Sequence, residues 1–270
     1  MSRIFHIVVC GGLVPDPLQT LEPLQGPSGW GIKNEAMLPA VLDPWAACSL
    51  WEAAALAKAR PGSRVWLVCA APKAKLQQVM MALAQKAPFE LVPVDSPAGG
   101  FSDPAETAAA LAEAISAVPG LEKDKLLLFG GWESASRGAG ATLAMLAESL
   151  GITEQFQGVD RVAEAADGTL EVLERVEGGK HQASLLDGPP AAFGWATGSL
   201  PEPPNNPQTG MANMKALMPA LQKAKAVKPT GGGLEFLSVS LPKQKRDTKV
   251  LKDWTVEQIA QDIVAWIKTN

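Results

Sequence analysis

The chain has 270 residues, a formal net charge of −4 and a sequence pI near 5.4. This charge argues against nucleic acid as a partner, because neutralising phosphates requires a basic surface. With 47% apolar and 19% charged residues, the composition is that of a globular protein with a well-buried core. Cys10, Cys48 and Cys69 are widely separated and form no CxxC motif. We therefore expect reduced thiols in a cytoplasmic protein, without disulfides or a zinc site.

The first half of the chain alternates predicted strands with predicted helices. Asp43 and Asp103 each precede a proline and are suited to cap the helix that follows. Such apolar strands, alternating with helices, predict an α/β fold with a parallel sheet and helices on both faces, of the Rossmann-like (adenine-nucleotide alpha-hydrolase-like) class. The expected strands are residues 4–10, 64–69, 89–94 and 125–129, and the expected helices are residues 44–60, 74–86, 105–118 and 142–151.

The pattern changes after Gly151. Residues 161–197 predict a β-meander with hairpin turns at Asp167-Gly168 and Gly178-Gly179. A proline-rich, loop-like segment follows, and an amphipathic helix is expected near the end of the chain, at residues 254–268. We expect three parts: an α/β domain at 1–198, a loop segment at 199–230 and a C-terminal arm with its helix at 231–270. The opening apolar run is too short to span a bilayer and lacks a signal-peptide layout, so no membrane insertion is expected.

The sequence offers no catalytic constellation. His6 and His181 have no metal-like partner at helical spacing, and the chain contains no tyrosine. The GxSxG, GxxxxGK[ST] and GxGxxG motifs are all absent. Cys10 stands at a predicted strand end without an obvious base, so a small residue beside a ligand is favoured over a nucleophile.

The turn SASRGAGAT at Ser134–Thr142 joins a predicted strand to a predicted helix. Its glycines allow a ligand to approach the backbone, and free N–H groups at a helix start attract anionic oxygens. Ser134, Ser136, Arg137 and Thr142 could add side-chain hydrogen bonds. A phosphate-holding turn and a plain strand–helix connection both remain open at this point.

The order of these pieces resembles the β (small) subunit of electron transfer flavoproteins over most of the chain. The segments that carry the resemblance are IVVCGGLVPDP, the Asp43-Pro44-Trp45 helix start, VCAAP, GGWESASRGAGATLAMLAESLGIT, PPAAFGWAT and LMPALQKAK. LAESLGIT is nearly intact, whereas SASRGAGA replaces the acidic and Gln-containing turn of the family and Asp43 replaces its Asn.

The resemblance implies an electron carrier subunit without catalytic residues of its own. FAD would be held mainly by an α subunit, and this chain would bind structural AMP. Asp43 is expected to face the ribose or the base, because a carboxylate would repel phosphate. The implied cofactor-binding residues are Val9, Cys10, Gly11, Asp43, Cys69, Ala70, Ser134, Ser136, Arg137, Gly138, Ala139, Gly140, Ala141 and Thr142.

The resemblance also implies three protein partners: the α subunit, a flavoprotein dehydrogenase as donor and a quinone reductase downstream. The dehydrogenase would dock on Leu217, Met218 and Pro219, inside a basic rim of nearby lysines. This segment could instead be a short helix on the chain's own core, and the C-terminal helix could contact the α subunit or the chain's own sheet. A stand-alone adenine-nucleotide-binding sensor is the alternative function. A nucleotide-dependent ligase or hydrolase is disfavoured, because Glu133 is the lone acid of the turn.

Overall fold

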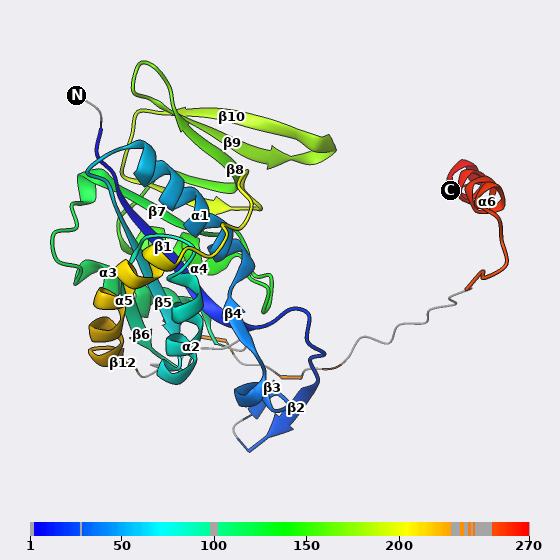
Figure 1. Cartoon of the computed structure of the whole chain (residues 1–270), viewed down its shortest axis with the longest axis horizontal. Coiled ribbons are helices and arrows are strands. Elements are labelled where there is room, and N and C mark those ends of the chain that lie inside the picture. The colour runs from blue at the N-terminus through cyan, green and yellow to red at the C-terminus, as the bar shows by residue number, and fades with distance from the viewer. Residues whose placement is uncertain are drawn as a thin grey trace. The chain divides into compact units, whose positions relative to one another are not determined.

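The computed structural model describes residues 3–27, 29–97, 102–227 and 250–269, together with residues 233, 234, 237, 238 and 240. It divides into one compact unit at Met1–Val239 and a second at Ser240–Asn270 (Figure 1). Most of the stretch between Val227 and Val250, which the sequence assigns to the arm, lies outside the described residues.

The first unit is built on a mostly parallel sheet, in the order β10-β9-β8-β11-β7-β1-β5-β6-β12. The parallel strands are β1 (His6–Pro15), β5 (Arg64–Ala71), β6 (Glu90–Asp95), β7 (Leu126–Gly131), β8 (Gln155–Glu164), β11 (Ala191–Trp195) and the short β12 (Lys225–Ala226). On the β8 edge, β9 (Leu170–Val176) and β10 (Lys180–Leu186) continue antiparallel. The strand β4 (Ala40–Leu42) pairs antiparallel with the end of β1, and β2 (Pro23–Gly26) and β3 (Gly29–Ile32) form a separate hairpin.

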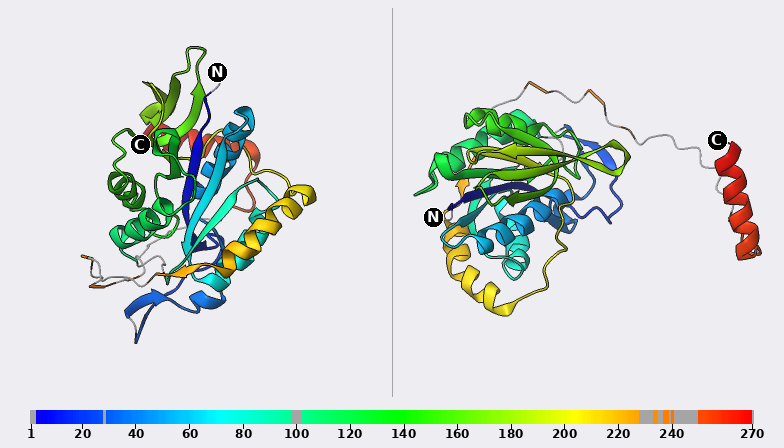
Figure 2. Two further views of the ribbon diagram at one scale, coloured as in Figure 1. Left: turned by 90° about the vertical axis from the view of Figure 1, so that its left-hand side faces the viewer. Right: turned by 90° about the horizontal axis from the view of Figure 1, so that it is seen from above.

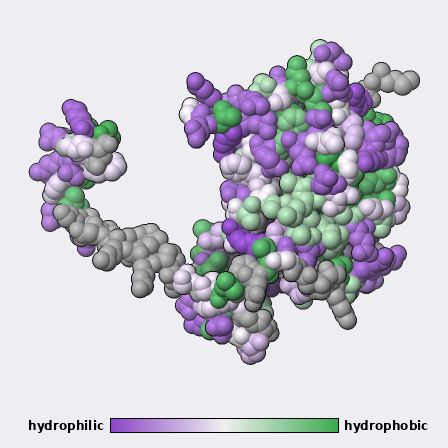
Figure 3. All heavy atoms as spheres, turned by 180° about the vertical axis from the view of Figure 1, so that it is seen from behind, coloured by the Kyte–Doolittle hydropathy of each residue, from purple (hydrophilic) through white to green (hydrophobic). Residues whose placement is uncertain are grey.

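Helices cover both faces of this sheet (Figure 2). One face carries α1 (Pro44–Ala59), α2 (Lys73–Leu83) and α5 (Pro207–Gln222), which bury Leu50, Leu76 and Leu217 against the strands. The other face carries α3 (Pro104–Ser116) and α4 (Ala141–Ser149), which bury Leu111 and Leu146. The predicted α/β class is therefore confirmed. The α3–α4 face shows a pale green patch from behind (Figure 3), as expected for alanine-rich helices.

The predicted caps at Asp43 and Asp103 are confirmed. Each carboxylate accepts a hydrogen bond from the backbone N–H two residues later, at 3.1 Å for Trp45 and 2.8 Å for Ala105. In both helices a proline occupies the first turn, where its missing N–H costs nothing. These caps fix where α1 and α3 begin, directly beyond the carboxyl ends of the strands.

Three expectations from the sequence were wrong. β1 does not end at Cys10 but continues through Gly11 and Gly12, which pair with Cys69 and Ala70 of β5. The run at Ala191–Trp195 is not part of the meander, since it lies between β7 and β8, parallel to both. Residues 207–222, expected to be loop-like with a short helix around Leu217 left open, form the long helix α5, whose Asn206 cap accepts from Gln208 and Thr209. Its proline, Pro219, lies close to the helix end, where a proline is less disruptive.

His6 lies at the start of β1, far along the strand from Gly12. The residue is 6% exposed, and its ring meets Trp66 edge-on, with ring centroids 5.3 Å apart. The Glu122 N–H donates to His6 Nδ1 at 3.0 Å, so Nδ1 must be unprotonated. Burial lowers the pKa of His6 below its usual value, with the Glu122 carboxylate partly opposing this effect.

This environment predicts a pH-dependent stability. Because the pKa is lower in the folded state, the stability contributed by His6 is intact above the ordinary pKa of about 6.5 and is lost as the pH falls below it. We expect the free energy of unfolding, measured by urea denaturation, to fall from pH 7 to pH 5 more steeply in the wild type than in His6→Asn. The asparagine oxygen keeps an acceptor for the Glu122 N–H but does not titrate. If the free energy of unfolding fell equally with pH in the two proteins, a lowered pKa of His6 in the folded state would be contradicted.

Candidate nucleotide site

A pocket of about 150 Å³ lies at the carboxyl ends of β1 and β7, and we call it the switch-point pocket. From β1 the chain progresses through β5 to β6 on one side, whereas β7 lies on the other side of β1. The strand order therefore reverses between β1 and β7. In open α/β sheets, ligands bind in the crevice at such a reversal, outside the carboxyl ends of the strands.

The structure brings most of the predicted cofactor residues together around this pocket. Those that line it are Cys10, Gly11, Asp43, Ala70, Ser134, Ser136, Arg137, Ala139, Gly140, Ala141 and Thr142. Val9 and Cys69 instead have fully buried side chains in the core on the α1 face. Gly138 belongs to the turn but does not line the pocket.

The sequence missed the wall that α3 contributes. Ser102, Pro104 and Thr107 line the pocket, as do Gly12 of β1 and Gly130 of β7. The only sequence signal for this wall was the predicted helix start at Ser102-Asp103-Pro104, which follows the carboxyl end of a predicted strand. Its place beside the 134–142 turn depends on the strand order, which the sequence did not reveal.

Asp43 organises the turn from within the protein. Its Oδ2 accepts the Ser134 hydroxyl at 2.7 Å and the Ala135 N–H at 2.9 Å, while Oδ1 accepts the Trp45 N–H. The residue is 5% exposed, and burial raises the pKa of its carboxyl, with the hydrogen bond from Ser134 opposing this shift. Both carboxylate oxygens join the start of α1 to the turn. Asp43 also lines the pocket, so the expectation that it faces a ribose or a base stays a prediction.

The first turn of α4 opens onto the pocket. Gly140 is its N-cap with φ +64°, and no side chain caps the helix. A Cβ at Gly140 would lie 2.7 Å from the Trp132 carbonyl oxygen, so glycine is required there. Ala141, Thr142 and Leu143 line the pocket and begin the helix, where backbone N–H groups lack intrahelical partners. This arrangement suits an anionic oxygen.

Arg137 spans two walls of the pocket. Its guanidinium donates to the Ser102 carbonyl oxygen at 3.1 Å, which links the turn after β7 to the start of α3. Arg137 therefore brings a positive charge into the pocket that the uncapped start of α4 also lines. Glu133, which also lines the pocket, brings a carboxylate to the same turn.

The glycines at the strand ends differ in whether packing within the protein requires a glycine there. A Cβ at Gly131 would come within 2.6 Å of Trp45 Cβ and 2.7 Å of the Glu133 carbonyl oxygen. A Cβ at Gly12 would meet only the Ala70 carbonyl oxygen, at 3.6 Å, an ordinary contact. The protein itself does not need glycine at position 12, where the missing side chain leaves room in the pocket. A nucleotide phosphate or sugar therefore fits the residues present.

A second hollow of about 580 Å³ adjoins this pocket and shares Leu13, Val14 and Ser102 with it. Its outer wall includes Trp30 and Gly31 of β3, and we call it the hairpin pocket. Together the two hollows provide the volume usual for a small-molecule site, which the switch-point pocket alone does not.

The thiols of Cys10 and Cys69 are poor nucleophiles. Complete burial raises the pKa of the Cys10 thiol far above its usual value and that of Cys69 to about 12. Cys10 therefore lines the pocket as a protonated thiol at neutral pH. It is not a strong nucleophile in this state, because only a thiolate is one. Within the described ranges, no three His, Cys, Asp or Glu side chains form a group that could hold a metal ion.

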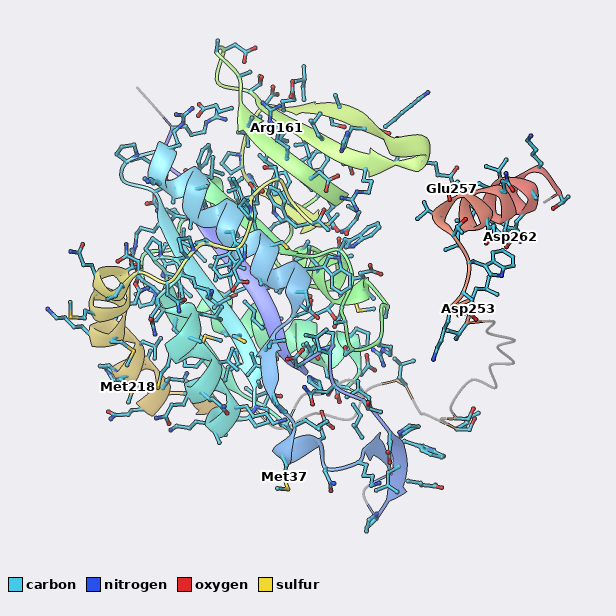
Figure 4. The ribbon with its side chains drawn as sticks, turned by 45° about the vertical axis from the view of Figure 1, so that its right-hand side comes forward. Met37, Arg161, Met218, Asp253, Glu257 and Asp262 are labelled. Atoms are coloured by element: carbon cyan, nitrogen blue, oxygen red, sulfur yellow. The ribbon has the colours of Figure 1, made fainter. Side chains whose placement is uncertain are left out.

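The predicted docking residues lie on α5. Leu217 is 2% exposed and belongs to the core, Met218 is partly buried against the same core and Pro219 is exposed. Figure 4 labels Met218 on this helix. Leu217 therefore anchors α5 to the sheet and leaves Met218 and Pro219 as the accessible part of the predicted docking segment.

The second unit carries α6 (Val256–Thr269). Its apolar side chains are exposed, including Ile263 at 52% and Trp266 at 66%, and Glu257 and Asp262 lie on the same helix (Figure 4). Among the described residues, no helix combines the length and apolar character needed to cross a membrane.

Comparison with protein families gives one match. The family model described as "Electron transfer flavoprotein domain" matches residues 33–229, which contain α1 through α5 and all residues of the switch-point pocket outside β1. This domain is that of the electron transfer flavoprotein β subunit, and it also occurs as the N-terminal domain of the α subunit. No curated protein matches the chain.

The glycine contacts predict opposite outcomes for two alanine substitutions. Gly131→Ala is expected to lower the free energy of unfolding by about 1–3 kcal/mol, because its Cβ would overlap Trp45 and the backbone of the turn. Gly12→Ala is expected to stay within about 0.5 kcal/mol of the wild type. Chemical denaturation of the two variants, with Gly31→Ala as a control in open space, measures the difference. Equal destabilisation at positions 12 and 131 would contradict the packing.

Proposed function

The chain belongs to the electron transfer flavoprotein family, and we propose that it is the β subunit of a cytoplasmic heterodimer. Proteins of this family are electron carriers. In the proposed heterodimer, an FAD held mainly by the α subunit accepts electrons from a flavoprotein dehydrogenase and passes them to a quinone reductase. This chain binds a structural nucleotide, provides a surface for the α subunit and carries the docking segment for the dehydrogenase, without catalytic residues of its own.

One observation supports the nucleotide role above the others. The uncapped first turn of α4 opens into a pocket at the strand-order reversal, beside Arg137 and the unfilled space at Gly12. Backbone N–H groups and a helix dipole bind a phosphate without needing the acidic and Gln-containing turn that the family usually has. We propose AMP as the ligand, with its phosphate at Ala141 and Thr142.

The docking segment follows from the placement of α5. Met218 and Pro219 present apolar surface near the helix end, and Lys215, Lys223 and Lys225 are exposed around them. Such a small apolar contact with a basic rim suits brief encounters with an acidic partner, which electron transfer requires. We propose this surface as the contact for the dehydrogenase.

The C-terminal helix supports the subunit role. Exposed isoleucines recur along α6 at helical spacing, at positions 259, 263 and 267, and form an apolar stripe. An exposed apolar stripe of this kind is typical of a surface that another protein covers. We propose that the α subunit provides that cover.

The phosphate position can be tested on α4. Thr142→Glu places a carboxylate in the first helical turn, where it favours the helix dipole but repels a phosphate. We expect at least about tenfold weaker AMP binding by calorimetry, little change for adenosine, and unchanged or higher thermal stability. The neutral variant Thr142→Gln controls for size and should bind AMP much more tightly than Thr142→Glu. Equal losses for AMP and adenosine would place the phosphate elsewhere.

The role of α6 can be tested by co-expression with the product of the adjacent gene. Ile263→Asp should abolish recovery of a flavin-containing heterodimer, because it places a charge within the apolar stripe. Gln261→Asp adds the same charge on the opposite side of the helix and should leave the heterodimer intact. A stable lone chain that carries AMP or ATP without any flavin-binding partner would favour the nucleotide-sensor alternative and would refute the subunit role.

A further inference from the structure

The stretch between β1 and β4 leaves the main sheet and returns to the same place. At its two ends, the Asp16 N–H donates to the Pro39 carbonyl oxygen at 2.9 Å. The antiparallel ladder of β1 and β4 leads up to this point, with Pro15 opposite Ala40. Residues 17–38 therefore form an excursion with a closed base, which we call the flap. It contains the β2–β3 hairpin and projects away from the main sheet (Figure 1).

The flap is weakly attached to the rest of the protein. None of its described residues is buried, and none joins either hydrophobic core. Within the described part of the chain, β2 and β3 pair only with each other. Beyond the base, one hydrogen bond ties the described residues of the flap to the body of the chain: Lys75 Nζ of α2 donates to the Glu35 carbonyl oxygen at 2.7 Å. Segments with so few buried contacts open far more easily than the whole protein unfolds.

The flap forms the outer wall of the hairpin pocket. Trp30, Glu35 and Ala36 line this pocket from the flap, whereas Pro72 and Lys75 line it from the start of α2. Because the flap is not packed on the core, its position can change and the width of the pocket changes with it. The hydrogen bond from Lys75 crosses from one wall to the other and holds them together.

The position of the flap bears on the proposed ligand. The switch-point pocket, at about 150 Å³, is too small for a whole nucleotide and shares Leu13, Val14 and Ser102 with the hairpin pocket. A nucleotide whose phosphate lies at the start of α4 therefore extends into the hairpin pocket, on the inner side of the flap.

We propose that the flap is a lid that closes over the bound nucleotide, with its hinge at Asp16 and Pro39 and a latch at Lys75. The inference rests on the proposed nucleotide site and goes beyond it, because it assigns ligand retention to a segment that mostly precedes residue 33, where the family match begins. Closing places Trp30 against the ligand and slows its release. Opening breaks the latch and leaves the main sheet intact.

Hydrogen exchange followed by mass spectrometry tests the motion on the full chain, freed of nucleotide. Flap amides should be protected less than about a hundredfold, and those of β1 and β5 at least about a thousandfold. Saturating AMP should raise the protection of the flap. A flap protected as strongly as β1 without nucleotide, or one whose exchange AMP leaves unchanged, would make it a fixed wall and overturn the proposal.

The release rate of radiolabelled AMP, chased with unlabelled AMP, tests retention. A two-residue Asn-Gly turn in place of residues 17–38 joins β1 to β4 as an ordinary hairpin. This variant should keep the thermal stability of the wild type, because no described flap residue joins the core, and release AMP at least about tenfold faster. Lys75→Met keeps the chain intact, removes the latch and should speed release about threefold to tenfold. Lys58→Met, exposed in the last turn of α1, removes the same charge and should leave the rate unchanged.

An unchanged release rate in both the shortened variant and Lys75→Met would refute the lid. Equal acceleration by Lys58→Met would assign the effect to the net charge of the protein and would also refute the latch. If the wild type binds no AMP, the nucleotide site itself is refuted, whereas the exchange of the flap without nucleotide still reports whether it opens. The two failures are therefore distinguishable.

Discussion

The carboxylate of Asp43 holds together two segments that are far apart in the chain, and the geometry of the site depends on it. One oxygen starts α1 by accepting the Trp45 N–H, and the other accepts the hydroxyl and N–H groups of Ser134 and Ala135, about ninety residues later. Burying a carboxylate is costly, and the raised pKa of Asp43 reflects that cost. The three donors offset it and favour the ionised form. Because these donors occur on both segments, the start of α1 and the turn after β7 are fixed relative to each other.

Close backbone packing also fixes the position of α1 at the strand ends. Gly11 faces Ala46 of α1 so closely that a Cβ would approach Ala46 Cβ to 2.8 Å, and Gly131 meets Trp45 at a similar distance. The N-terminus of α1 therefore sits directly on the ends of β1 and β7. With α1 held there, the crevice opens toward α3 and α4, and the uncapped end of α4 becomes a wall of the pocket. A tighter or looser packing at these glycines would alter the width of the site.

The sequence predicted the elements of the first half well, because their signals are local. Asp-Pro pairs marked the starts of α1 and α3, and apolar runs marked the central strands. It failed where tertiary context decides the outcome. Gly11 and Gly12 ended the predicted strand because glycine is a strand breaker in isolation, yet β5 pairs with both. The full length of α5 was missed, and only a short helix around Leu217 was left open, because its prolines suggested a loop; they stand at the first turn and near the end, where a helix tolerates them.

The same distinction between local and tertiary signals explains the site. The 134–142 turn was found from its composition alone, and most of its residues line the pocket. The sequence did not reveal the structural role of Asp43, because its hydrogen-bond partners Ser134 and Ala135 lie far along the chain. Composition can reveal such a turn, but the carboxylate that holds it in place comes from a segment about ninety residues earlier, and only the fold brings the two together.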